Sequence, residues 1–144
     1  MMKTVAQILA KKGRDVWSVE AGDSVYSALE LMAQKNIGAV LVTEASKPVG
    51  ILSERDYARK VVLMKRVSRD TAVSEIMTPN PVCVRPDQSI EDCMALMTAK
   101  RFRHLPVVEG DAVVGMLSIG DVVESMISER EFLIQQLENY ITGA

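Results

Sequence analysis

The chain has 144 residues and a formal net charge of −2, which argues against a general nucleic-acid surface, because such a surface needs clustered excess Lys and Arg. Hydrophobic residues make up 48% of the sequence and aromatic residues only 4%, so we expect a globular chain with an aliphatic core. Residues 1–12 lack the apolar run of a signal peptide, and no stretch is long and apolar enough to span a membrane. These features predict a cytoplasmic protein without membrane contact.

The two cysteines, Cys83 and Cys93, fall in a predicted strand and on the apolar face of a predicted helix. Such placement is typical of small core residues. Two cysteines and a single histidine are too few ligands for a metal site, and core placement of both cysteines disfavours a disulfide, so we expect neither.

In chain order, the spacing of Val5, Ile8 and Leu9 predicts a short helix that Gly13 ends. A strand over 16–19 and a helix over 24–36, capped by Asp23 or Ser24, follow. Next come strands over 39–43 and 49–52, joined by a turn that contains Lys47 and Pro48.

The stretch 50–56, GILSERD, returns at 115–121 as GMLSIGD, at a constant offset of 65 positions. Holding that offset, the same residue recurs without a gap at pairs such as Val19/Val84 and Leu31/Leu96. The copied elements are a helix from Val73, strands over 82–85, 105–108 and 112–117 with a turn over 109–111, and a helix capped by Asp87 or Ser89. We therefore predict two repeats, 4–68 and 69–127, each reading helix, strand, helix, strand, strand, helix, packed together in a pseudo-symmetric α+β fold.

The last predicted helix runs from Asp121 to Ile141, with apolar residues at steps of three and four. The extension over 128–144 is long for so small a body. It would either lie back on its own domain or pack on a partner subunit. We favour the partner subunit and expect a homodimer, because so long an apolar stripe needs a covering surface.

The recurring motif has a Ser and, three residues later, an Asp: Ser53 with Asp56, and Ser118 with Asp121. This spacing is typical of a capping box, in which the Ser hydroxyl caps a helix. A preceding glycine that permits close approach, and a helix N-terminus that attracts anions, favour a ligand site instead. Each Asp would then accept hydrogen bonds from ribose hydroxyls. The two roles do not exclude each other.

Both copies resemble the Gly-hydrophobic-x-Ser/Thr-x-x-Asp signature of cystathionine-β-synthase (CBS) domains, as do residues 76–84, IMTPNPVCV, and 103–108, RHLPVV. The resemblance covers about residues 4–127 and implies a paired module, often called a Bateman module, with two clefts for adenosine-containing ligands such as AMP, ATP, S-adenosylmethionine or NAD(H). Each cleft would be composite. One would combine Ile51, Ser53 and Asp56 with Phe102, Arg103 and His104; the other would combine Met116, Ser118 and Asp121 with Ile37, Gly38 and Ala39.

The two predicted clefts differ in charge. Near the first lie Arg55, Arg59 and Lys60, and with Arg103 and His104 they would suit a diphosphate, a triphosphate or a pyrophosphate. A solvated helix face would explain Arg55, Arg59 and Lys60 equally well, and His104 would also be ordinary at a strand edge. The second cleft has Gly120 in place of Arg55, so it would suit a nucleoside end, a monophosphate or no ligand.

The leading hypothesis is a regulatory module that binds an adenine nucleotide, requires no metal, and signals to an unidentified partner protein without catalysis. Similarity to small bacterial and plant-organelle CBS pairs suggests AMP or NAD(H) as the ligand. A ligand-free dimerisation scaffold is the alternative. An enzyme acting on nucleotides is disfavoured, because the sequence shows no catalytic constellation.

Overall fold

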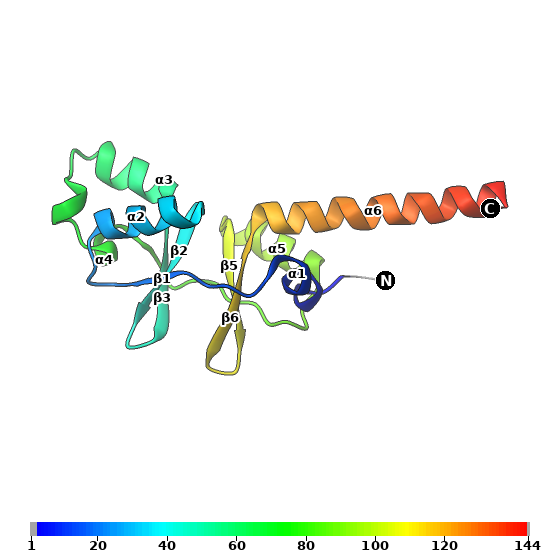
Figure 1. Ribbon diagram of the computed structural model, residues 1–144, viewed down its shortest axis with the longest axis horizontal. Helices are drawn as coiled ribbons and strands as arrows, with labels where there is room; N and C mark the ends of the chain where they lie inside the picture. The colour runs from blue at the N-terminus through cyan, green and yellow to red at the C-terminus, as the bar shows by residue number, and fades with distance from the viewer. Residues whose placement is uncertain (1–2, 144) are drawn as a thin grey trace. The chain divides into compact units, whose positions relative to one another are not determined.

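The computed structural model describes residues 3–143. These residues form two compact units, one from 3–14 and 83–143 and the other from Asp15–Val82. Both units mix helices with strands (Figure 1). The predicted α+β class and the long C-terminal helix are confirmed.

The unit 15–82 is built on a four-stranded sheet in the order β1-β2-β3-β4. β1 pairs in parallel with β2, and the other two pairs are antiparallel. The strands are β1 (Ser18–Glu20), β2 (Ala39–Glu44), β3 (Lys47–Ser53) and β4 (Thr78–Pro79). The helices are α2 (Val25–Lys35), α3 (Glu54–Tyr57), the π-helical turn η1 (Ala58–Val62), the 3-10 turn η2 (Ser68–Asp70) and α4 (Val73–Ile76). Buried aliphatic side chains from β1, α2, β2, β3 and α4 form its core.

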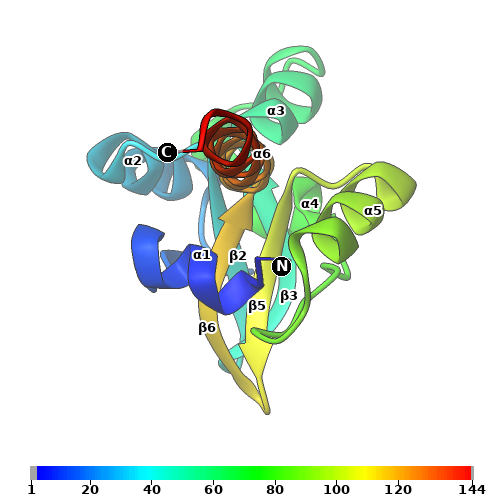
Figure 2. The same cartoon turned by 90° about the vertical axis from the view of Figure 1, so that its right-hand side faces the viewer.

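The other unit contains a β-hairpin with helices on both sides. Figure 2 shows α1 beside β6 and α5 beside β5. Its elements are α1 (Val5–Lys12), α5 (Ile90–Lys100), β5 (His104–Glu109), β6 (Ala112–Ser118) and α6 (Ile119–Thr142). The fully buried side chains at its centre come from every element: Val5, Leu9, Ile90, Cys93, Leu105, Leu117 and Val122.

The compact units do not coincide with the sequence repeats. Helix α1 precedes the first repeat's strand in sequence, yet Thr4 bridges Ser89 and α1 belongs with residues 83–143. In the same way Ser24 bridges Ala72, so α4 belongs with residues 15–82. The repeat boundaries at 4–68 and 69–127 remain a description of the sequence and stay a prediction.

The predicted caps are present. Ser24 caps α2, Ser89 caps α5, and Gly13 ends α1 with φ of 106°. At α5 the Asp92 side chain also accepts a hydrogen bond from the Ser89 N–H at 3.3 Å, which completes a capping box.

Two predictions about the strands were wrong. The first hairpin turns at Ala45 and Ser46, both with positive φ, while Lys47 and Pro48 lie inside β3. Pro48 is tolerated there because the β2–β3 register shifts between Val42 and Thr43, opposite it. Around Val84 the predicted strand over 82–85 is reduced to one parallel bridge to Val107, since prolines at 81 and 86 cannot donate to a ladder.

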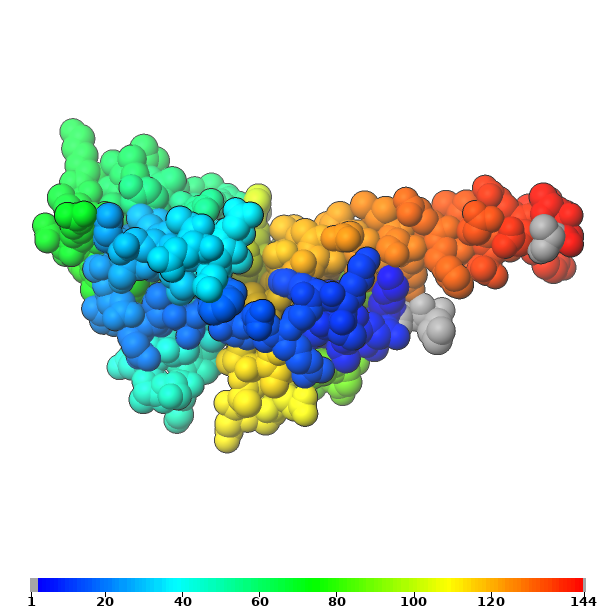
Figure 3. Space-filling view, in the orientation of Figure 1, coloured from blue at the N-terminus to red at the C-terminus, as the bar shows by residue number. Residues whose placement is uncertain are grey.

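Helix α6 is continuous over 24 residues, as predicted. Its first turns pack on α5, α1 and β6, and Val122 is its one fully buried side chain among the described residues. The space-filling view in Figure 3 shows its later turns standing clear of the rest of its unit.

Candidate functional site

The first motif copy lies where β3 ends and α3 begins. Asp56 accepts hydrogen bonds at Oδ2 from the Ser53 N–H at 3.0 Å and from the Ser53 hydroxyl at 3.1 Å. The Asp56 N–H in turn donates to Ser53 Oγ at 3.2 Å. The other oxygen, Oδ1, lies 3.5 Å from Lys60 Nζ and 3.4 Å from the Thr78 hydroxyl. Both oxygens of Asp56 therefore have donors within its own unit.

The second copy repeats this capping box at the junction of β6 and α6. The Ser118 N–H donates to Asp121 Oδ2 at 2.8 Å, and the Asp121 N–H donates to Ser118 Oγ at 3.1 Å. Lys12, in the last turn of α1, donates to the same Oδ2 at 2.6 Å and to the Met116 carbonyl at 2.6 Å. Cap and ion pair thus share one oxygen of Asp121, and neither uses Oδ1.

Opposing effects set the acidity of Asp121. Burial by itself would raise its pKa, but hydrogen bonds from Lys12 and Ser118, together with the Lys12 charge, hold the pKa below its ordinary value of 3.8. The carboxylate is therefore ionised at neutral pH, which is the form that accepts hydrogen bonds from hydroxyl groups.

At the start of each motif helix, some of the backbone N–H groups already donate hydrogen bonds to other groups of the chain. The Glu54 N–H donates to the Gly38 carbonyl at 3.0 Å, and the Ile119 N–H donates to the Arg103 carbonyl at 2.8 Å. With the third N–H of each helix bound to the cap serine, two of the first three amides are used. An anion at these N-termini would have fewer backbone donors than the sequence motif alone indicates.

The structure brings Gly38 close to Ser53 and Arg103 close to Ser118, each within its own unit. β2 pairs with β3 and β5 with β6, so Ala39 lies opposite Ser53 and His104 opposite Ser118. The composite combinations across the two repeats stay predictions. The other predicted residues divide by exposure: Ile51 and Ala39 are buried, Ile37, Phe102, His104 and Met116 are half-buried, and Arg55, Arg59 and Arg103 are exposed.

Lys12 and Thr78 are the contacts that sequence reasoning missed. In the sequence, Lys12 is a cation at the end of a helix, and Thr78 is part of the segment 76–84 that resembles the family. Lys12 lies 109 positions before Asp121, so no local pattern connects them. Lys60, for which the sequence left a phosphate contact and a solvated helix face open, is paired with Asp56 and donates to the Ile76 carbonyl at 3.0 Å.

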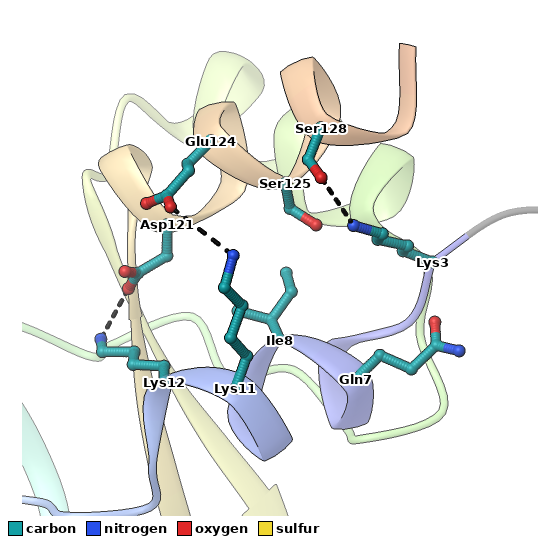
Figure 4. A pocket seen from close by; sticks show the side chains of 9 residues that line it. All are labelled: Lys3, Gln7, Ile8, Lys11, Lys12, Asp121, Glu124, Ser125 and Ser128. Carbon is teal, nitrogen blue, oxygen red and sulfur yellow. Dashed lines mark hydrogen bonds and ion pairs between the residues drawn. The ribbon is translucent and has the colours of Figure 1, made fainter. Parts of the chain in front are cut away.

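Asp121 also lies at one end of a groove between α1 and α6, with a volume of about 250 Å³. Figure 4 shows Lys11 facing Glu124 and Lys3 facing Ser128 across it. The two contacts measure 3.9 Å and 3.4 Å. The groove carries charges of both signs, and polar contacts at several points along the groove connect α6 with α1 and with Lys3 just before it.

The motif glycines have a packing role. A Cβ on Gly115 would lie 2.7 Å from Leu9 Cδ2, and one on Gly50 would lie 2.6 Å from Met77 Sδ and 2.9 Å from the Thr78 carbonyl oxygen. The close approach that we predicted at these glycines is thus made by the chain's own side chains and backbone.

Residues 3–143 hold neither a membrane-spanning helix nor a cluster of metal ligands. None of their helices has the combination of length and apolarity that crossing a membrane requires. In the same range, His, Cys, Asp and Glu side chains do not gather in threes or more around a place for a metal ion.

Comparison with known proteins gives a consistent result. The sequence model described as "CBS domain" matches residues 5–63 and 73–128. "CBS domain-containing protein CBSX3, mitochondrial" of Arabidopsis thaliana is 36% identical over 97% of this chain and 72% of its own length. The chain spans only 22% of a second Arabidopsis match, "CBS domain-containing protein CBSCBSPB2", at 33% identity.

Solved structures agree with this result. A CBS-domain protein from Burkholderia ambifaria is 52% identical, with a TM-score of 0.83 over 88% of this chain and 95% of its own. A CBS domain protein from Pyrobaculum aerophilum, solved with AMP, has a TM-score of 0.73 over 83% of this chain and 89% of its own. The CBS domain pair of MJ0100, solved with 5′-methylthioadenosine and S-adenosylmethionine, has a TM-score of 0.78 over 90% of this chain and 99% of its own. At 23% and 21% identity these last two show the shared fold alone.

Two matched domains thus cover most of the sequence, each with its Ser and Asp at a strand-to-helix junction. On that evidence, and on the 36% identity to a CBS-domain protein, this chain belongs to the CBS domain family.

Proposed function

We propose that this protein is a regulatory module that binds an adenosine-containing ligand and signals its level to another protein without catalysing a reaction. The observation that carries the proposal is the motif carboxylate, which is held at a strand-to-helix junction in both repeats. An ionised Asp in that position suits the two hydroxyls of a ribose. The AMP and S-adenosylmethionine found in family members support this ligand class.

Asp121 is our preferred ribose acceptor. Its cap and its ion pair both use Oδ2, whereas Asp56 has donors near each of its two oxygens. A ribose at Asp56 would have to replace Lys60 or Thr78, at a cost in free energy. In the other predicted cleft, at Asp56, the exposed Arg55, Arg59 and Arg103 would contact phosphates. We keep AMP, ATP and NAD(H) as the candidate ligands.

Signalling would follow from differential affinity. A ligand held by residues of both repeats would favour one relative orientation of the repeats, by no more than its preference for that state. The proposal also includes a homodimer, an unidentified regulated protein and a cytoplasmic location. The alternative function is a dimerisation scaffold that binds no nucleotide, in which Ser and Asp serve only as helix caps.

The test is calorimetric titration of nucleotide-stripped protein with AMP, ATP, NAD, NADH and S-adenosylmethionine. Asp56→Ala and Asp121→Ala are compared with Asp92→Ala, which removes the same capping-box acid from α5, outside the motif. We expect one ligand to bind, and a motif variant to lose roughly tenfold or more in affinity. Asp92→Ala should keep the affinity.

If all three variants lose affinity equally, the effect comes from helix capping and the ribose role is refuted. If no ligand binds to folded, empty protein, the scaffold function replaces the sensor.

A further inference from the structure

The exposed side of α6 carries a seam that nothing in the described chain covers. Its members recur at alternating steps of four and three residues: Val123, Ile127, Arg130, Ile134, Leu137 and Ile141. Each of the hydrophobic members has an exposed side chain, including Ile134 at 54% and Leu137 at 55%. Alternation of four and three is the 3.5-residue repeat of a left-handed coiled coil.

The later part of α6 has no support from its own unit. Ser128 still accepts a hydrogen bond from Lys3, and the later turns of the helix stand clear of α1 and α5, as Figures 1 and 3 show. Only about fourteen residues remain to Thr142, and isolated helices of roughly 12–15 residues are marginal in water. The helix also contains no Pro or Gly between Asp121 and Thr142 at which it could bend back. Its stability therefore needs an external surface.

We propose that this surface is α6 of a second copy of the chain, and that the two helices run antiparallel. The seam would bury the same residues on both copies, which is the self-complementary contact of a two-fold dimer. This inference rests on the homodimer of the proposed function and adds the interface and its orientation. It does not depend on nucleotide binding.

Arg130 decides the orientation. It is the only charged residue in the seam, and a parallel pair in register would bring the two guanidinium groups face to face. In an antiparallel pair with Ile127 opposite Leu137 of the second copy, Arg130 lies opposite Ile134. Glu131 and Glu138 of the second copy flank that position, three residues before and four after it. Each Arg130 then lies between two carboxylates, so the charges are complementary.

The interface is tested on the full chain by sedimentation velocity over a range of concentrations. Ile134→Glu places a charge in the seam, whereas Phe132→Glu places the same charge off the seam on the same helix. Phe132 is 66% exposed, which makes it a matched control. We expect a dimer for the wild type and for Phe132→Glu, and at least a tenfold weaker dimer for Ile134→Glu.

A monomeric wild type at high concentration would overturn both this inference and the proposed homodimer. A dimer equally stable in Ile134→Glu would overturn the α6 interface and leave the homodimer standing. Nucleotide titration of Ile134→Glu separates either result from the sensor function, because its motif residues are unchanged.

Cysteine cross-linking tests the orientation. Ile127→Cys and Leu137→Cys proteins are oxidised separately and as a mixture, with wild type as the control for Cys83 and Cys93. We expect a disulfide dimer in the mixture and little in either protein alone. Self-cross-linking of each variant would show a parallel pair and overturn the orientation.

Reversing Arg130 to Glu should weaken the dimer, and adding Glu131→Arg with Glu138→Arg should restore it.

Discussion

At the scale of single residues, the two motif aspartates differ in their surroundings although their sequences match. Asp121 is paired with Lys12 from a distant helix, whereas Asp56 is paired with Lys60 one helical turn away. Both acids also complete a capping box. Each of the two acids therefore contributes both to a helix cap and to an ion pair, and mutations must separate these contributions.

Asp121→Asn should isolate the ion pair, because an amide oxygen still accepts the bond from the Ser118 N–H. We expect a loss of about 0.5–1 kcal/mol in the free energy of unfolding at pH 7. Since the folded pKa lies below 3.8, this stability is present above that pH and disappears as the pH falls through the folded value. Urea unfolding at pH 7 and at low pH measures it.

Asp87→Asn is the control, because the Arg85–Asp87 pair is exposed and should contribute almost nothing. A difference between wild type and Asp121→Asn that is as large at low pH as at pH 7 would contradict an ionic origin.

Cys93 offers a second prediction at this scale. Burial, followed by the neighbouring charge of Asp92, raises the pKa of its thiol to about 11. We expect a Cys83→Ser variant to show no reactive thiol toward Ellman's reagent at pH 8 when folded, and one after unfolding in urea. Rapid labelling of the folded variant would show that Cys93 is accessible and refute its role in the core.

At the scale of elements, the contact between α1 and β6 leaves no room for a Cβ at Gly115. Gly115→Ala would place a methyl group against Leu9, which is 1% exposed and has little room to move. We expect a destabilisation of roughly 1–3 kcal/mol by chemical unfolding. Gly110→Ala would not be a valid control because of its positive φ, so Gly120→Ala, with no Cβ contact below 3.6 Å, serves instead.

In the wild type, Leu9→Ala would leave a cavity and lower the free energy of unfolding by about 2–5 kcal/mol. If overpacking is the cause of the Gly115→Ala effect, Leu9→Ala should lower the free energy of unfolding by less in the Gly115→Ala background. Strictly additive effects in this double-mutant cycle would contradict the steric explanation.

At the scale of the whole molecule, a bound ligand should stabilise the folded chain. Ligand at a hundred times its dissociation constant contributes about 2.7 kcal/mol if it binds only the folded state. We expect thermal unfolding of stripped protein to shift upward with the true ligand, and Asp121→Ala to abolish that shift. A shift that persists unchanged in both Asp121→Ala and Asp56→Ala would place the ligand elsewhere.

Local sequence patterns determined much of the molecule. The duplication, the types and order of most elements, the caps at Ser24 and Ser89 and the length of α6 followed from spacing and capping rules that act within a few residues. The family signature added the proposed ligand class. Errors arose at Pro48, which pairing with β2 holds inside β3, and around Val84, where the prolines at 81 and 86 limit the predicted strand to one bridge.

Tertiary structure alone decided which helix joins which unit, which lysine meets which aspartate, and which backbone groups occupy the starts of α3 and α6. Lys12 and Asp121 are 109 positions apart, and the Arg103 carbonyl reaches Ile119 only because β5 and β6 pair. Such contacts depend on how distant segments pack. Periodicity reports which face of an element is buried, but it does not report which partner covers that face.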